Sequence, residues 1–411
     1  MTIQQIERDG DIDQISAAFN VFAPELQGDP FPVLHRLRTE RPIAHSEMFG
    51  GYWILSKYEN IRDVLSNPSV FSSTKPTIPM PPVDITINSI PVQMDPPDHT
   101  EYRRILGPLF SPARVAALEE SLRASARALI EKMLETPNEI DFLEAFAIPL
   151  PCLAILHLLG LPEEDLDLLI EMKNDMLTDQ FSPDDAVRQA FVDNRIPEIV
   201  AYFTKHIDAR RDPSTAPDDF ITRIVHAKFA DERSLTVMEM VNMIALLISA
   251  GLDTTTAQLA FFTTYFAENQ DRWQELANHP ERIPGAVEEL LRHNAIVTLA
   301  RLVTEDVEIG GQKFKAGEQV LLLLSAAAFD EDEFPDARTV DFERRPNRHM
   351  TFGGGPHRCL GSPLARLELK IAVEELREAI PKFELAGTPR RDFGLIMNTL
   401  ELRLRIPSDL G

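Results

Sequence analysis

The sequence has few cysteines. Only Cys152 and Cys359 occur among its 411 residues, so at most one disulfide can form. So few cysteines exclude a disulfide-stapled scaffold and the cysteine clusters that hold iron–sulfur centres. No Cys-x-x-Cys or closely spaced histidine pair accompanies Cys359, which argues against a zinc site, and no flavin-binding glycine fingerprint is present.

Positive charge is also scarce. The chain has 41 Lys+Arg against 65 Asp+Glu, a formal net charge of −24. A chain this acidic repels nucleic acid and anionic membranes, and it contains no basic stripe. We therefore predict a soluble protein without a nucleic-acid partner.

Long hydrophobic runs are missing too. The longest, Met243–Leu252 and Val320–Phe329, fall short of the roughly 20 residues that span a bilayer. Residues 1–13 are polar and acidic and do not resemble a secretory signal. These features predict no membrane association and a cytoplasmic location of the bacterial type.

Helical periodicity dominates the rest of the chain, which has no internal repeat. The expected helices are Pro32–Glu40, Tyr58–Ser66, Pro112–Glu135, Asp184–Arg211, Leu235–Phe266, Pro280–His293 and Leu360–Ala379. The expected strands form a hairpin around Gly50-Gly51 (Ile43–Ser46 with Tyr52–Ser56), a second around Gly310-Gly311 (Val307–Ile309 with Lys313–Phe314), and the segments Ile296–Ala300 and Val320–Leu324. We predict a mainly α fold with a small β part, as a single domain over residues 29–411 after an N-terminal extension over 1–28.

The strongest local signal is the segment Phe352-Gly-Gly-Gly-Pro-His-Arg-Cys359-Leu-Gly361, which leads into a helix. Glycines let the backbone approach a bulky partner, and the start of a helix favours a thiolate. A thiolate held in this way can be a metal ligand or a nucleophile. The bland alternative is an inert buried cysteine, and that interpretation fits Cys152, which lies in an apolar helical stretch.

This segment resembles the haem-binding loop of the cytochrome P450 family, through Phe352, Gly353, Gly355, His357, Cys359, Gly361 and Ala365. The resemblance extends from about Asp29 to the C-terminus and is greatest to soluble bacterial members, including the camphor-hydroxylase branch. It implies haem b whose iron takes the Cys359 thiolate as axial ligand, with Phe352 and Gly361 beside the cofactor. It also implies the single-domain fold of that family.

A second motif, Ala250-Gly-Leu-Asp253-Thr254-Thr, lies in the middle of the long apolar helix. Small residues leave room for a ligand, and the Thr254 hydroxyl can return to the carbonyl of Ala250. Taken alone, the motif could be a helix bend with Asp253 bound to a surface cation. The resemblance makes Asp253 and Thr254 the acid–alcohol pair that delivers protons to dioxygen.

Charged residues complete the pattern. Glu289 and Arg292 are three residues apart on one helix, and with Arg344 they match a buried structural network of the family. Four cations match positions that bind the haem propionates: His99, Arg103, Arg301 and His349. Each of them taken alone could be an ordinary surface cation.

The resemblance also assigns a substrate pocket, formed by Ile85, Ile87, Ser89, Leu246, Ala250, Val297, Leu299, Ile396 and Met397. Nearly all are apolar, so we expect a small apolar substrate such as a terpenoid or a small aromatic. Because the chain has no redox centre of its own besides the haem, electrons must come from a ferredoxin-type partner. An arginine patch is the expected docking face: Arg104, Arg348, Arg358 and Arg366. The alternative is that these arginines bind haem or structural carboxylates.

The main expectation is therefore a monooxygenase that uses O2 and external electrons. Two alternatives remain open: a haem-thiolate peroxygenase or isomerase, and a haem sensor without turnover. The pair Asp253–Thr254 argues against both, because neither needs a proton relay.

Overall fold

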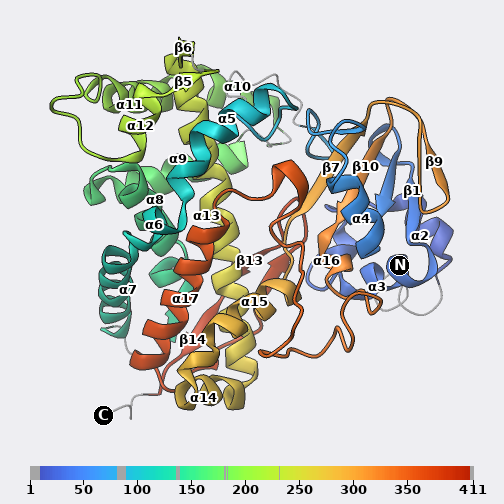
Figure 1. Ribbon diagram of the computed structural model, residues 1–411. Helices are drawn as coiled ribbons and strands as arrows, with labels where there is room; N and C mark the ends of the chain where they lie inside the picture. Colours follow the sequence, from blue (N-terminus) through green and yellow to red (C-terminus); the bar gives the residue numbers. More distant parts are fainter. Residues whose placement is uncertain are drawn as a thin grey trace.

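The computed structural model describes residues 10–80, 89–135, 139–179, 182, 184–230 and 232–407. The chain is mostly helical with a small β part, which confirms the predicted fold class. Most helices gather on one side of the molecule, and the larger sheet lies on the other side with the N-terminal segment and helices α2 (Ile12–Ala18), α3 (Phe31–Glu40), α4 (Tyr58–Leu65) and α16 (Leu324–Ala327) (Figure 1).

The central element is α13, which spans Val237–Glu268 and confirms the longest predicted helix. Thr236 begins it with a capping box, because its hydroxyl accepts from the Glu239 N–H while the Glu239 carboxylate accepts from the Thr236 N–H. Among the described residues, α13 is the one helix long and apolar enough to cross a membrane. Its place marks it as a core helix instead, since it packs against α8 (Pro149–Leu159), α9 (Leu166–Thr178), α11 (Ile196–Asp208) and α17 (Ser362–Ala379).

Most predicted helices are present with small shifts of their ends: α3 (Phe31–Glu40), α4 (Tyr58–Leu65), α15 (Ile283–His293) and α17. Two were predicted too long. Residues 112–135 form α6 (Pro112–Ala116) and α7 (Glu119–Leu134), and residues 184–211 form α10 (Asp185–Ala190), a π-helical turn (Phe191–Arg195) and α11. Pro197 accounts for the second division, because proline has no N–H to continue the helical bonding into the preceding turn.

Several helices were not predicted: α2 (Ile12–Ala18), α9, α12 (Phe220–His226) and α14 (Gln270–Asn278). A further helix, α5 (Asp98–Leu106), holds two predicted propionate ligands, His99 and Arg103.

The larger sheet has five strands in the order β1-β2-β10-β7-β3. They span Ile43–Ser46, Tyr52–Leu55, Gln319–Leu323, Thr298–Val303 and Phe71–Ser72 respectively. The two predicted hairpins are confirmed, β1 with β2 and β8 (Val307–Ile309) with β9 (Gln312–Phe314). Strand β7 begins two residues later than predicted and runs to Val303, so Arg301 lies within it.

The C-terminal segment supplies the smaller sheets. Strand β14 (Arg403–Arg405) lies between β11 (Glu384–Leu385) and β4 (Glu139–Asp141), and β12 (Arg390–Asp392) pairs with β13 (Asn398–Glu401). A further small hairpin joins β5 (Lys228–Phe229) to β6 (Arg233–Ser234).

The described residues form three apolar core clusters, and the largest surrounds α13. A second cluster combines Phe19, Val21 and Leu26 of the N-terminal segment with Phe393 and Met397 near the C-terminus. The described part of residues 1–28 is thus packed into the domain. The boundary at residue 28 stays a prediction.

Candidate active site

The loop before α17 presents the Cys359 side chain. Gly353 and Gly355 adopt positive φ values of 68° and 60°. A Cβ at Gly355 would lie 2.0 Å from the Leu65 carbonyl oxygen, so only glycine permits this close approach to the end of α4. The Cys359 N–H donates to the Phe352 carbonyl at 2.8 Å, which closes the loop just before the helix.

The surroundings of the Cys359 sulfur suit a ligand held inside the protein. Burial raises the pKa of the Cys359 thiol, whereas backbone N–H groups of Gly361 and Ser362 and the charge of Arg103 favour its thiolate. The side chain is nevertheless accessible to solvent. A group that is deep in the protein and still accessible faces an interior space.

The middle of α13 also borders an interior space. Ala250 is exposed, although Ile248 and Leu252 on either side are buried. The Thr254 hydroxyl donates to the Ala250 carbonyl oxygen at 2.8 Å, as the sequence predicted. An exposed residue in the centre of a core helix fits a cavity that a large ligand fills.

Asp253 is held by a lysine from another helix. Lys173 of α9, which is only 7% exposed, donates to Asp253 Oδ1 at 2.8 Å. Burial raises the pKa of the Asp392 carboxyl, and the charge of Asp253 raises it further, so the two acids lie near each other. The surface-cation alternative for Asp253 is thus wrong, because the partner is a buried lysine.

Four cationic or ionisable side chains converge on one buried region: His99 and Arg103 of α5, Arg301 of β7, and His357 of the cysteine loop. The rings of His99 and His357 lie 3.8 Å apart. Burial and the neighbouring arginines lower the pKa of His99 to about 4 and of His357 to about 3, and burial lowers the pKa of Arg301 to about 10. These neutral histidines and unneutralised arginines form a site for an anion.

Hydrogen bonding in this region is incomplete. Both ring nitrogens of His99 and Nε2 of His357 are buried without a partner among the described residues. Arg301 donates to the carbonyl of its neighbour Ala300. The nearby Asp95 carboxylate already accepts from the hydroxyl of Ser72 and the N–H of Ser73. Unpaired buried donors beside two arginines fit the carboxylates of haem propionates.

His349, predicted to join this group, binds a carboxylate instead, although its Nδ1 is also buried without a partner among the described residues. Its Nε2 is 3.1 Å from Glu288 Oε2, and Arg366 donates to the same carboxylate at 2.5 and 3.0 Å. The Arg366 guanidinium also lies over the Phe352 ring, 4.5 Å from its centroid. The Glu288 carboxylate of α15 therefore binds His349. We assign to His357 the place beside His99, Arg103 and Arg301 that we predicted for His349 from the sequence. The fixed spacing of His357 two residues before Cys359 was the available signal.

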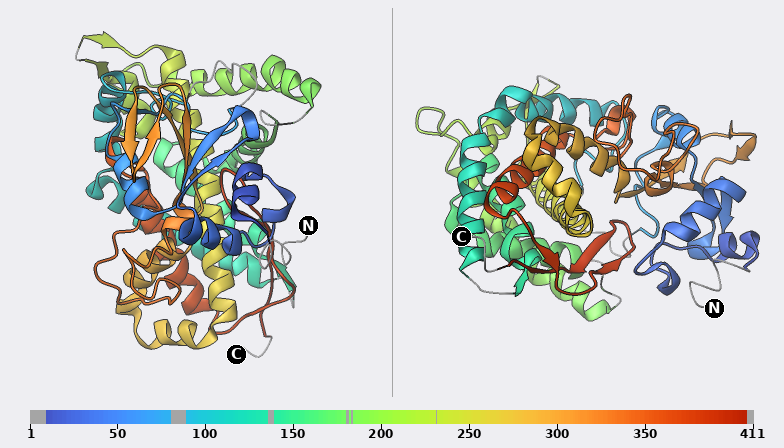
Figure 2. Two further views of the ribbon diagram at one scale, coloured as in Figure 1. Left: turned by 90° about the vertical axis from the view of Figure 1, so that its right-hand side faces the viewer. Right: turned by 90° about the horizontal axis from the view of Figure 1, so that it is seen from below.

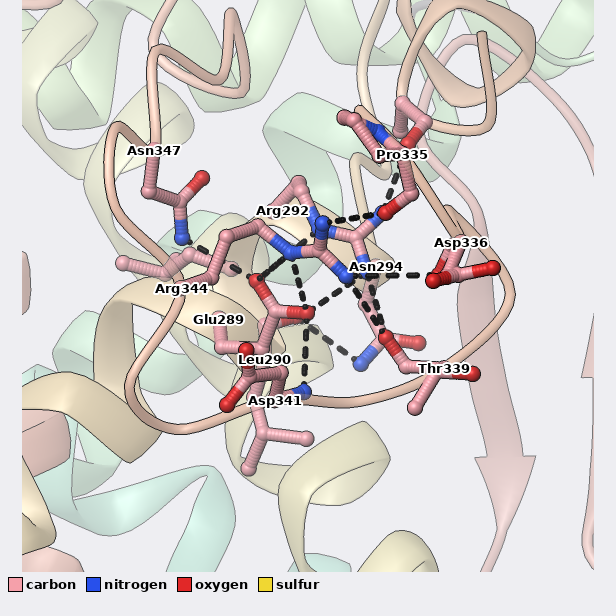
Figure 3. Close-up of polar contacts among 12 residues, drawn as sticks. Glu289, Leu290, Arg292, Asn294, Pro335, Asp336, Thr339, Asp341, Arg344 and Asn347 are labelled. Atoms are coloured by element: carbon pink, nitrogen blue, oxygen red, sulfur yellow. Dashed lines mark hydrogen bonds and ion pairs between the residues drawn. The ribbon is translucent and has the colours of Figure 1, made fainter. Parts of the chain in front are cut away.

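The predicted ion pair is fully buried (Figure 3). Arg292 Nε and Nη2 donate to the Glu289 carboxylate at 2.9 and 2.7 Å, and Arg344 Nε donates at 3.0 and 3.1 Å. The N–H of Asp341 and the amide of Asn347 also donate to it, each at 3.1 Å. The Glu289 carboxylate thus binds several residues of the segment 341–347, which leads to the cysteine loop.

The arginines bind backbone carbonyls with their remaining donors. Arg292 donates to the carbonyl of Ala328, and Arg344 to the carbonyls of Pro335 and Thr339. The network therefore ties α15 to the segment 328–347.

The predicted pocket residues come together only in part. Met397, which was predicted to line the pocket, is 1% exposed and packs in the second apolar cluster instead. Val297 and Ile396 form an isolated β-bridge, and the Met397 N–H donates to the Ile296 carbonyl at 2.8 Å. Leu299 lies beside the cysteine loop, because a Cβ on Gly353 would be 3.8 Å from its Cδ1. Leu246 and Ala250 lie on α13, and Ser89 is half-buried. Ile85 and Ile87 fall outside the described residues.

The predicted docking arginines surround the outer side of the cysteine loop. A depression of about 350 Å³ is lined by Arg62, Arg348, Arg358, Arg366, Glu288 and the glycines 353–355. Arg348 pairs with Glu333 and Arg366 with Glu288, while Arg104, outside the depression, pairs with Glu101. Arg358 is exposed and has no carboxylate partner within the described ranges. The structural-carboxylate alternative holds for three of the four.

Comparison with known proteins agrees with this geometry. A family model described as cytochrome P450 matches residues 283–408. The chain is 35% identical to cytochrome P450-SU2 of Streptomyces griseolus over 376 residues, 89% of each chain. It is 32% identical to the polyketide biosynthesis cytochrome P450 PksS of Bacillus subtilis (strain 168), covering 90% of this chain and 93% of PksS.

Solved structures show the same fold. That of PksS matches with a TM-score of 0.85 and 30% identity, over 95% of this chain and all of the other. The crystal structure of CYP101J2 matches with a TM-score of 0.84 and 26% identity, over 95% and 96% of the two chains.

Proposed function

The chain belongs to the cytochrome P450 family, and from that premise we propose that it hydroxylates a compact apolar substrate with electrons from a ferredoxin-type protein. The family assignment makes it a haem-thiolate monooxygenase with haem b on a cysteine thiolate. The overall reaction converts a C–H group, O2, two electrons and two protons into an alcohol and water. The accessible Cys359 sulfur inside the protein is the observation that carries the assignment.

Five residues of this chain suit the cofactor. Cys359 would ligate the iron, and His99, Arg103, Arg301 and His357 would hold the propionates, since they form the buried cationic region without a free carboxylate. Haem b, when bound, activates dioxygen and accepts the electrons. His349 is not part of this proposal, because Glu288 already binds it.

Proton delivery falls to α13. The Thr254 hydroxyl now donates to the Ala250 carbonyl. During the reaction it would break this bond and donate a hydrogen bond into the space that the exposed Ala250 borders. Asp253 would receive protons from solvent, and Lys173 holds its carboxylate until then. The relay therefore requires both a carboxylate and a hydroxyl.

The substrate class follows from the lining. Leu246, Val297, Leu299 and Ile396 are apolar, and none of the predicted positions carries a lysine or arginine to bind a carboxylate. We infer that shape, rather than charge, orients a terpenoid or small aromatic molecule. PksS, by its name, acts in polyketide biosynthesis, so a larger substrate is the competing outcome.

Titration of the ferric protein with three matched sets of compounds tests this choice. Monoterpenoids and small aromatics should change the haem absorption at micromolar concentration, whereas macrolide-sized polyketides should not. Binding of the polyketides alone would reverse the assignment. Single-turnover reduction in the presence of a binding compound should then yield its alcohol.

We further propose that an acidic ferredoxin docks over the depression beside the cysteine loop in the cytoplasm. Arg358 is the exposed arginine there without a carboxylate partner among the described residues. It can therefore pair with an acidic partner without breaking an ion pair inside this protein. Arg348 and Arg366 would add to the field of this face although they also bind Glu333 and Glu288.

A further inference from the structure

The Gln27 side chain binds both backbone groups of one residue far along the chain. The Phe393 N–H donates to Gln27 Oε1 at 2.7 Å, and Gln27 Nε2 donates to the Phe393 carbonyl at 3.0 Å. A side-chain amide has the same donor and acceptor as a peptide group, so Gln27 acts on Phe393 as a neighbouring strand would.

The segment 393–397 is bound from another direction as well. The Thr298 N–H donates to the Leu395 carbonyl at 2.9 Å, and the Met397 N–H donates to the Ile296 carbonyl at 2.8 Å. Val297 and Ile396 form a β-bridge between these two bonds. The connection between β12 and β13 is thus held between Gln27 and the segment leading into β7.

Packing reinforces the amide contact. Phe393 is 2% exposed and shares an apolar cluster with Phe19, Val21 and Leu26 of the N-terminal segment. A Cβ added at Gly394 would lie 3.3 Å from the Phe22 ring, so the two segments touch closely. In the view from below, the C-terminal strands reach toward the N-terminal part of the chain (Figure 2).

We propose that Gln27 is a positioning residue that fixes Ile396 in the wall of the substrate pocket, while the neighbouring Met397 packs into the core. The inference rests on the proposed function, because it assumes that Ile396 contacts the substrate. Gln27 lies in the segment expected to be an extension, yet its bonds end three residues from Ile396. Losing them frees one side of the segment and leaves the bonds from 296–298 in place.

Azole binding to the ferric holoenzyme separates this role from general stability. Imidazole reports only on binding to the haem iron, because it is small. The phenyl group of 4-phenylimidazole must in addition fit against the wall of the substrate pocket. We expect Gln27→Ala to leave the imidazole Kd within about twofold and to weaken 4-phenylimidazole about five- to tenfold, the equivalent of one net hydrogen bond. The Phe393 amide should also exchange faster with deuterium. Gln312→Ala is the matched control, because the hydrogen bond of that amide is exposed and, within the described part of the chain, runs to its neighbour Lys313.

A second pair of variants keeps the test independent of Gln27→Ala folding. Gly394→Ala brings a methyl group against Phe22 and should change the 4-phenylimidazole Kd at least about threefold. Adding Phe22→Ala should restore it. An unchanged 4-phenylimidazole Kd in both Gln27→Ala and Gly394→Ala would overturn the proposal. Equal weakening of both azoles would overturn it too, since that is a general structural effect. A wild-type protein that binds neither azole would instead refute the haem-thiolate assignment.

Discussion

Replacing Glu289 by glutamine probes the buried network that supports the cysteine loop. The wild-type carboxylate accepts hydrogen bonds from two arginines, one backbone N–H and one asparagine amide. Glutamine has nearly the same shape but no charge, and its NH2 group faces donors. The change therefore leaves Arg292, which is 0% exposed, and Arg344 with uncompensated charge.

Breaking a buried pair in this way costs about 3–5 kcal/mol. With an unfolding entropy of about 2.1 cal/mol/K per residue, this cost lowers the Tm of the 411-residue chain by roughly 4–6 °C. Because the network fixes the segment before the cysteine loop, haem content should fall as well. Glu40→Gln serves as the control. It removes an exposed pair with Arg36 on a helix surface and should change the free energy of unfolding by less than about 0.5 kcal/mol.

The assay is thermal and urea unfolding followed by circular dichroism, with the haem content of the purified protein measured in parallel. A Glu289→Gln variant with wild-type Tm and full haem content would refute the reasoning. So would a variant that loses only catalytic rate.

Three further predictions follow from the site. Asp253→Asn removes the acid of the proton relay and should lower product formed per electron on the order of 100-fold, with substrate binding unchanged; normal coupling of oxygen uptake to product would count against the relay. Burial tends to raise the pKa of Glu288, but hydrogen bonds from His349 and Arg366 lower it to about 2 from an ordinary 4.5. The ionised carboxylate therefore stabilises the fold above about pH 4.5, and this stability is lost as the pH falls toward 2. Glu288→Gln should therefore cost about 1–2 kcal/mol at pH 7 in urea unfolding and almost nothing near pH 2; a difference independent of pH would contradict this. Arg358→Glu should slow reduction by an acidic ferredoxin about tenfold at low salt while the haem spectrum stays unchanged, and an unaltered rate would exclude this docking face.

The sequence was most informative where chemistry depends on local spacing. The glycine-rich loop, the Ala250–Thr254 motif and the Glu289–Arg292 pair each lie within ten residues, so their geometry could be predicted before the fold was known. The back-bond from Thr254 and the pairing of Arg292 with Glu289 follow directly from such spacing, whereas Arg344, 55 residues from Glu289, was assigned from the family resemblance.

Contacts between distant segments could not be predicted in this way. His357 had a local signal in its spacing to Cys359, but the contact between His349 and Glu288 of α15 could be seen only in the fold. The Lys173–Asp253 and Gln27–Phe393 contacts join residues 80 and 366 positions apart. The division of residues 184–211 was missed because the apolar pattern continues through Pro197.

The bond between iron and the Cys359 sulfur can be measured most directly by the absorption of the reduced carbon-monoxide complex. Wild-type protein should give the red-shifted band of a thiolate ligand, and Cys359→Ala should lose that band even if some haem remains bound. Persistence of the thiolate band in Cys359→Ala would contradict the account, because Cys152, the other cysteine, lies in the core helix α8.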